Sequence, residues 1–118
     1  MKVVIPMDEN RRDVCVAFGR APLFLVHDTE TGKGEMLENP AAQAQGGAGL
    51  KAAQFVADQA PDALITVRCG ENAAMVLQAA KIAIYKAQGS TAQENLAALQ
   101  EGKLEILTHF HAGFHGIH

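Results

Sequence analysis

The sequence is poor in residue types on which several protein classes depend. Aromatic residues make up 5% of its 118 residues, tryptophan is absent, and there are only two cysteines. Two cysteines are too few for a disulfide scaffold in a chain of this length. Cys15 and Cys69 are not in a CxxC arrangement, so we expect reduced thiols and a cytoplasmic protein. The core must be built mainly from Ala, Val, Ile and Leu, as in small α/β domains.

Long apolar runs and clusters of one charge are also missing. No run approaches the ~20 apolar residues that span a bilayer. The first residues, MKVVIPMDEN, reach Pro6 and Asp8 too early for a signal peptide. The 10 Lys and Arg and the 13 Asp and Glu give a net charge of −3, spread along the chain. Because a nucleic-acid surface needs a basic stripe, we expect no nucleic-acid partner. Because the apolar runs are short, we also expect no membrane segment.

The apolar pattern predicts an α/β fold in a single domain spanning residues 1–118, with 109–118 as its tail. Strands are expected at 2–6, 23–28, 35–38, 63–67 and 82–85. Helices are expected at 50–59, 72–80 and 91–99. The first three strands should form an antiparallel meander, because a glycine-rich turn joins the second to the third. The weak alternation at 14–18 leaves a short strand or an extended loop open.

Two local patterns refine this prediction. The unbroken apolar runs at 3–5 and 64–67 indicate central strands that are covered on both faces. Thr91 followed by Glu94 predicts a capping box at the start of the last helix. We therefore expect a mixed sheet with helices packed against it.

The last ten residues hold four of the five histidines, namely His109, His111, His115 and His118. Imidazole is a good ligand for Zn, Cu, Ni and Fe. In an extended chain His109 and His111 would point to one side. In a coiled chain His111 and His115 would come close together. The interleaved Phe110, Phe114 and Ile117 could dock this tail on the domain. Two interpretations stay open: a solvated tail with incidental metal affinity, or a tail that folds over a site near Cys69.

A glycine-rich loop precedes the first helix. Gly46, Gly47 and Gly49 would leave helix N–H groups accessible to an anion. The spacing is neither GxGxxG nor that of a P-loop, so the sequence does not indicate a nucleotide site. A flexible connection into the helix is the alternative interpretation.

Arg68 and Cys69 follow a predicted buried strand, at the end where open α/β sheets bind ligands. A thiol beside an arginine and ahead of a helix could have a lowered pKa and bind a soft metal. The alternative is a small buried side chain. Neither a cluster of carboxylates nor a GxSxG motif is present, so we expect no enzymatic activity.

Several segments together resemble the dinitrogenase iron-molybdenum cofactor biosynthesis family. They are MKVVIPMDEN at the start, FGRAPLFLVHD at 18–28, the Asn39–Pro40 break leading to GGAG, DALITVRCGENAAMVL at 62–77 and IAIYKAQGSTAQENLAAL at 82–99. The resemblance extends over nearly the whole chain. The family includes accessory proteins of nitrogenase cofactor assembly and the orange proteins of sulfate-reducing bacteria.

This resemblance implies a ribonuclease H-like α/β fold, with a five-stranded mixed sheet and helices on both faces. Family members bind or transfer molybdenum- or iron-containing sulfide clusters, and orange proteins carry a molybdenum-copper sulfide cluster without covalent protein-metal bonds. The His-rich end is more similar to the orange proteins. The chain departs from the family in two places: Lys81 replaces a common glycine, and 43–45 lacks a common histidine.

The expected function is therefore a non-catalytic carrier of a metal-sulfide cluster, of molybdenum-copper or iron-molybdenum type, with protein partners in cluster assembly. Arginine side chains and the amides of 46–49 would hold an anionic cluster, and the arginines are Arg11, Arg12, Arg20 and Arg68. Two alternatives remain: a protein-interaction or regulatory module whose metal site is unused, and a chaperone that binds Cu, Ni or Zn through its histidine tail.

Overall fold

The computed structural model describes residues 1–111. In this range the secondary-structure elements follow one another as β1 (Lys2–Met7), β2 (Leu23–Asp28), β3 (Gly34–Glu38), α1 (Ala48–Asp58), β4 (Ala63–Thr66), α2 (Glu71–Ala79), β5 (Ala83–Lys86) and α3 (Ala92–Gln100). The predicted element order is confirmed, and the predicted bounds differ by at most two residues.

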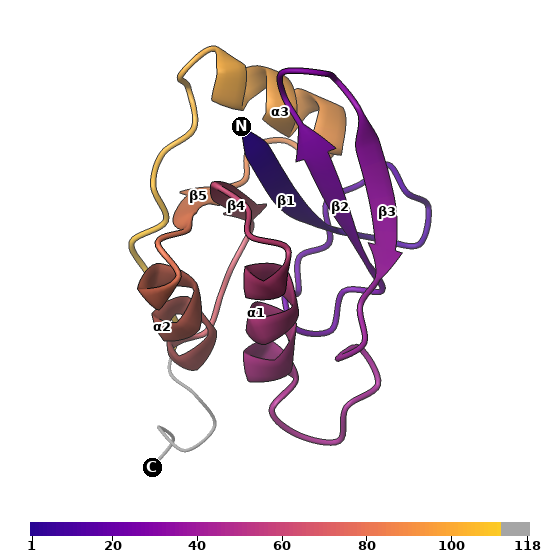
Figure 1. Cartoon of the computed structure of the whole chain (residues 1–118), viewed down its shortest axis with the longest axis vertical. Coiled ribbons are helices and arrows are strands. Elements are labelled where there is room, and N and C mark those ends of the chain that lie inside the picture. The colour runs from indigo at the N-terminus through magenta and orange to yellow at the C-terminus, as the bar shows by residue number, and fades with distance from the viewer. Residues whose placement is uncertain (112–118) are drawn as a thin grey trace.

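The strands form one mixed sheet in the order β3-β2-β1-β4-β5 (Figure 1). β1 pairs antiparallel with β2, and β2 pairs antiparallel with β3, which confirms the predicted meander. β4 runs parallel to both β1 and β5. β1 and β4 therefore both lie in the interior of the sheet, as their unbroken apolar runs predicted.

Alternate side chains of the strands pack on opposite faces of the sheet. Val4 and Phe24 belong to a core that includes buried residues of α1 and α2. Val3 and Ile5 belong to a second core, to which α3 contributes Ala92. The helices thus cover both faces, as predicted. We call the first face the two-helix face and the second the one-helix face.

The loop between β1 and β2 passes from one face to the other. Val14, in its first half, packs into the core of the one-helix face, and its N–H donates to the Ser90 carbonyl over 2.8 Å. Phe18, in its second half, packs into the core of the two-helix face. Between these anchors the chain makes single bridges and no strand, so 14–18 is an extended loop.

Particular residues determine where α3 begins and where α2 ends. The Glu94 N–H donates to Thr91 Oγ1 over 3.1 Å, and the Thr91 N–H donates to Glu94 Oε1 over 3.0 Å, so the predicted capping box is present. Lys81, just after α2, has a φ of 63°. This left-handed conformation suits glycine, which agrees with the glycine that the resemblance implies at this position.

After α3 the chain runs along the outer edge of β5. The Lys86 N–H donates to Glu105 O over 2.8 Å, and the Leu107 N–H donates to Ile84 O over 2.9 Å. Leu107 is buried, so this short extended segment is anchored. It carries the chain toward the start of α2.

Candidate functional site

The candidate site residues that precede the tail in the chain lie at one edge of the sheet. They are in loops, except Gly49, which is at the start of α1. β1, β4 and β5 all end there, and we call it the carboxyl edge (Figure 1). The loops at this edge are 8–22, 39–47, 67–70 and 87–91. Ligands of open α/β sheets commonly bind at such an edge.

The glycine loop leaves the amino end of α1 open. Gly47 is its N-cap with a φ of 66°, no side chain caps the helix, and its first turn holds no acidic residue. The first backbone bond of the helix runs from the Lys51 N–H to Gly47 O over 3.0 Å. By helix geometry, the N–H groups of 48–50 therefore lack an acceptor inside the helix. Of these three residues, Ala48 is buried, Gly49 is partly buried and Leu50 is exposed.

α2 begins beside α1. A Cβ atom placed on Gly49 would lie 3.9 Å from the Cβ of Ala73, so the first turns of the two helices touch. Both helices point their amino ends toward the carboxyl edge (Figure 1). The amino end of α1 is the one that favours an anion, because the first turn of α2 holds the acidic Glu71, whose N–H donates to His111 O.

Sequence reasoning missed Gly19, on which this arrangement depends. A Cβ at Gly19 would lie only 2.7 Å from the backbone nitrogen of Gly49, so the β1–β2 loop and α1 pack backbone against backbone. The buried Asn39 fixes this loop, since its amide donates to Gly19 O over 3.0 Å and to Ala21 O over 2.9 Å. An available signal was the Asn39–Pro40 pair, interpreted only as a strand break.

Arg20 holds the glycine loop itself. Its guanidinium donates to the carbonyl oxygens of Ala42, over 3.2 Å, and of Ala44. These bonds occupy the side chain with the protein's own backbone. Arg20 therefore positions the loop, in addition to adding charge near it.

Cys69 agrees with one of its two interpretations, that of a small buried side chain. Its side chain is packed into the core of the two-helix face and only 1% of the residue is exposed. Burial raises the pKa of the Cys69 thiol to about 11. The other interpretation, a lowered pKa, is wrong, because removal of the thiol from water disfavours its charged form. The thiol is therefore protonated at neutral pH, whereas Arg68 beside it is exposed.

The described part of the tail docks beside Cys69, as one of the two interpretations expected. The His111 N–H donates to Cys69 O over 3.2 Å, and the Glu71 N–H donates to His111 O over 3.0 Å. Phe110 packs against the two-helix core. His109 and His111 are exposed, while His115 and His118 lie outside the described residues.

The histidines do not form a complete metal-binding group within residues 1–111. In that range no three His, Cys, Asp or Glu side chains come together as a candidate metal site. The docked tail therefore brings imidazoles to the carboxyl edge without a ligand set among the described residues.

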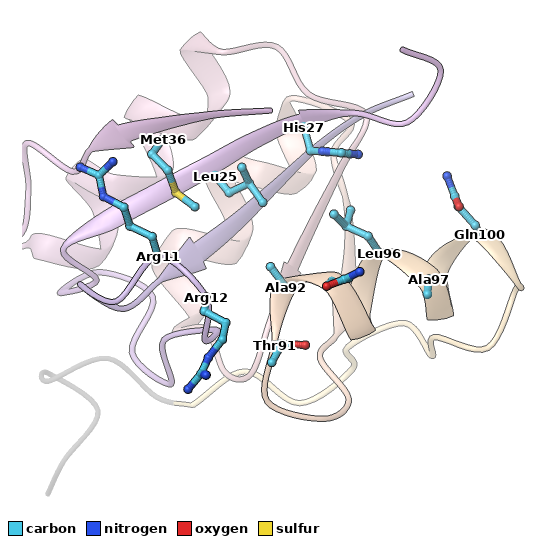
Figure 2. A pocket seen from close by; sticks show the side chains of 11 residues that line it. Arg11, Arg12, Leu25, His27, Met36, Thr91, Ala92, Leu96, Ala97 and Gln100 are labelled. Atoms are coloured by element: carbon cyan, nitrogen blue, oxygen red, sulfur yellow. The ribbon is translucent and has the colours of Figure 1, made fainter. Parts of the chain in front are cut away.

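Arg11 and Arg12 lie on the other face. They line a pocket of ≈ 520 Å³ together with Leu25 and Met36 of the sheet and residues of α3 (Figure 2). Arg12 forms an ion pair with Asp13 over 3.2 Å. The Asn10 side-chain hydrogen bond, and then that of Arg12, lower the pKa of Asp13. The structure thus separates Arg11 and Arg12 from the glycine loop.

No helix among residues 1–111 is both long and apolar enough to cross a membrane.

Comparison with known proteins finds related chains of nearly the same length. An uncharacterized protein of Methanocaldococcus jannaschii is 32% identical over 108 residues, which cover 89% of this chain and 90% of the relative.

Two solved structures share the fold. The apo form of the orange protein from Desulfovibrio gigas superposes with a TM-score of 0.84 at 27% identity, covering 91% of this chain and 92% of that one. A NifB-like protein from Thermotoga has a TM-score of 0.76 at 38% identity, covering 92% and 95%. The family described as dinitrogenase iron-molybdenum cofactor matches residues 1–102. The chain therefore belongs to the dinitrogenase iron-molybdenum cofactor family.

Proposed function

We propose that this protein is a non-catalytic cytoplasmic carrier of an anionic metal-sulfide cluster, of the molybdenum-copper or iron-molybdenum type. The observation that carries the proposal is the pair of helix amino ends at the carboxyl edge, where Gly49 of α1 touches Ala73 of α2. Membership of the family and the likeness to the orange protein supply the class of cargo. The ribonuclease H-like classification belongs to this proposal.

The groups at this edge suit a cluster that is held without ligation. The N–H groups at 48–50 are donors that no side chain caps, and Arg68 is an exposed cation. Charge-assisted hydrogen bonds from such donors to an anion are about twice as strong as neutral ones. Cys69 is protonated at neutral pH because burial raises its pKa to about 11, so it is not a ready thiolate ligand.

Non-covalent holding has a functional consequence. A cluster bound largely by amides and charge has few metal-ligand bonds to break when it leaves, which suits transfer to a protein partner in cluster assembly. Arg20 contributes by fixing the loop that ends in Gly46 and Gly47. Arg11 and Arg12 line the pocket on the opposite face and lie outside this proposed site.

The histidine tail completes the proposal as a cover. The backbone bonds of His111 to Cys69 and Glu71 place the start of the tail at the amino end of α2. We propose that 109–118 shields the bound cluster and that His109, His111, His115 and His118 supply metal contacts. A variant without 109–118 should fold normally but lose cluster colour faster in the presence of a chelator.

Reconstitution tests the proposal directly. Apo-protein mixed with tetrathiomolybdate and Cu(I) should acquire stoichiometric visible absorption bands that stay with the protein through gel filtration. Arg68→Glu should weaken retention roughly three- to tenfold, and more at low ionic strength, because salt screens the attraction. Lys33→Glu is the matched control, since Lys33 is exposed in the β2–β3 turn at the opposite edge.

Two results would contradict the proposal. If the protein stays colourless while its fold is intact, it carries no such cluster, and a regulatory module or a colourless metal chaperone fits better. If Arg68→Glu and Lys33→Glu retain equal amounts of cluster, the cluster does not depend on charge at the carboxyl edge.

A further inference from the structure

The pocket on the one-helix face is not used by the proposed carrier function. We propose that it is a second binding site, which takes a small organic anion with a flat apolar body and a single carboxylate at one end. At ≈ 520 Å³ it is within the range of small-molecule sites, about 300–1,000 Å³. The inference goes beyond the carriage of a cluster.

The pocket arises because α3 alone covers this face. Leu25 and His27 of β2 stand opposite Met36 and Gly34 of β3, and all four positions turn to the same side of the sheet. A Cβ on Gly34 would lie 3.1 Å from Leu25 Cδ1 and 3.3 Å from His27 Nδ1. The glycine therefore leaves these two side chains the room they occupy along the pocket.

The walls of the pocket are apolar. Leu25 and Met36 form the sheet side, and Ala92 and Leu96 form the helix side. Met36 and Leu96 are only partly buried, so apolar surface remains for a ligand to cover. Covering such surface contributes about 25 cal/mol per Å². An occupant should therefore present an apolar body to this part of the pocket.

The charge of the lining is of one sign. Among its 11 residues are Arg11, Arg12 and His27, and none is acidic, although the chain as a whole carries 13 acidic and 10 basic residues. The guanidinium of Arg12 is already paired with the carboxylate of Asp13. Arg11 makes no hydrogen bond or ion pair through its guanidinium within residues 1–111. The pocket therefore has an available cation for an anion.

Arg11 is also held in an unusual conformation. Its φ of 61° is left-handed, and its N–H donates to Asp8 O over 3.0 Å in the tight turn that sets this conformation. A non-glycine residue in this region is strained, and such strain is concentrated at functional sites. The turn thus directs an arginine to the pocket at a cost in stability.

The arrangement of the lining orients the ligand. Arg11 and Arg12 lie at one end, while Gln100 lies at the other end, beyond Leu96 (Figure 2). Arg11 suits a carboxylate, which a guanidinium group binds through paired hydrogen bonds. The anionic group should therefore sit at the arginine end, with the apolar body lying between β2–β3 and α3.

Calorimetric titration with 1-naphthoate tests this site, and 1-naphthamide serves as a neutral ligand of the same shape. We expect 1-naphthoate to bind and 1-naphthamide to bind at least about tenfold more weakly, since a charge-assisted bond contributes ≈ 1.5 kcal/mol or more. Arg11→Gln should weaken 1-naphthoate binding by a similar factor. Arg68→Gln, an exposed arginine that does not line the pocket, should not change it.

A second pair of variants locates the site. Ala97 lies exposed in the pocket lining, so Ala97→Trp should fill the groove and abolish 1-naphthoate binding. Ala79, equally exposed on α2, is the control, and Ala79→Trp should bind as the wild type does. Retained cluster uptake by Ala97→Trp would show that the two sites are separate. Undiminished 1-naphthoate binding by Ala97→Trp, equal binding of 1-naphthamide, or no binding by the wild type would overturn the inference.

Discussion

The two faces of the sheet are covered by different amounts of helix. On one face, α1 and α2 pack together and bury Phe24 completely, with its ring centroid 5.6 Å from that of Phe18 and 6.0 Å from that of Phe55. On the other face, α3 leaves Leu25 and Met36 lining a pocket of ≈ 520 Å³. The same sheet thus supports a closed core on one side and an accessible site on the other.

This difference shows where each kind of site can form. On the two-helix face α1 and α2 bury the sheet side chains, and the groups of our proposed cluster site are the helix amino ends at the carboxyl edge. On the one-helix face the ligand site is the uncovered sheet surface itself. A compact anionic cluster suits the first arrangement, and an anion with an apolar body suits the second.

The largest expected effect is a difference in stability between variants that shorten one side chain on each face. Phe24→Ala should lower the free energy of unfolding by about 3–5 kcal/mol, because it leaves a cavity in a closed core. Met36→Ala, at a half-buried pocket position, should cost about 1 kcal/mol or less. Urea unfolding followed by circular dichroism measures both. Equal losses would mean that the one-helix face is as tightly packed as the other.

A pair of glycine substitutions tests the contact that supports the carboxyl edge. Gly19→Ala should cost about 1–3 kcal/mol, because its Cβ would lie 2.7 Å from the Gly49 nitrogen, and backbone must move. It should also weaken cluster retention while leaving 1-naphthoate binding unchanged.

Gly46→Ala is the matched control for this pair. A Cβ at Gly46 meets nothing within 4 Å and the residue does not have a positive φ. We expect a change within about 0.5 kcal/mol of zero. If Gly19→Ala is equally harmless in unfolding experiments, the close packing of the β1–β2 loop on α1 is not important for the edge.

The smallest expected effects concern two residues with left-handed backbone, one associated with each face. Lys81→Gly, after α2, should raise the free energy of unfolding by about 0.5–1 kcal/mol, since glycine relieves the strain of a φ of 63°. Arg11→Gly should give a similar gain but weaken 1-naphthoate binding at least about tenfold, as Arg11→Gln should. Thermal unfolding and calorimetry measure the two effects. A loss of stability in both variants would show that the two turns are not strained.

The fold could be predicted from the sequence because its signals are local. The unbroken run at Val3–Ile5, the glycine turn after Asp28 and the Thr91–Glu94 capping box each determine an element through neighbouring residues. What covers each face could not be predicted in this way. It depends on how α1, α2 and α3 share the sheet, which is a property of the whole chain.

The candidate site was predictable only in part for the same reason. Glycine before a helix predicts an N-terminus without a side-chain cap, and Gly47 is the N-cap of α1 with no such cap. The sequence left open whether Cys69 has a lowered pKa or is simply buried, because burial, unlike a neighbouring arginine, cannot be seen in the local sequence. Arg11 was grouped with the glycine loop, since the sequence does not reveal that the 8–22 loop passes from one face to the other.

The central claim is that the carboxyl edge beside α1 and α2 holds the cluster. The most direct measurement is a ¹H–¹⁵N correlation spectrum recorded before and after loading with tetrathiomolybdate and Cu(I). The account predicts that the amides of 46–50, 69–73 and 109–111 shift most, and that those of Leu25, Met36 and Leu96 stay in place. Shifts concentrated on the one-helix face, with the glycine loop unchanged, would contradict it.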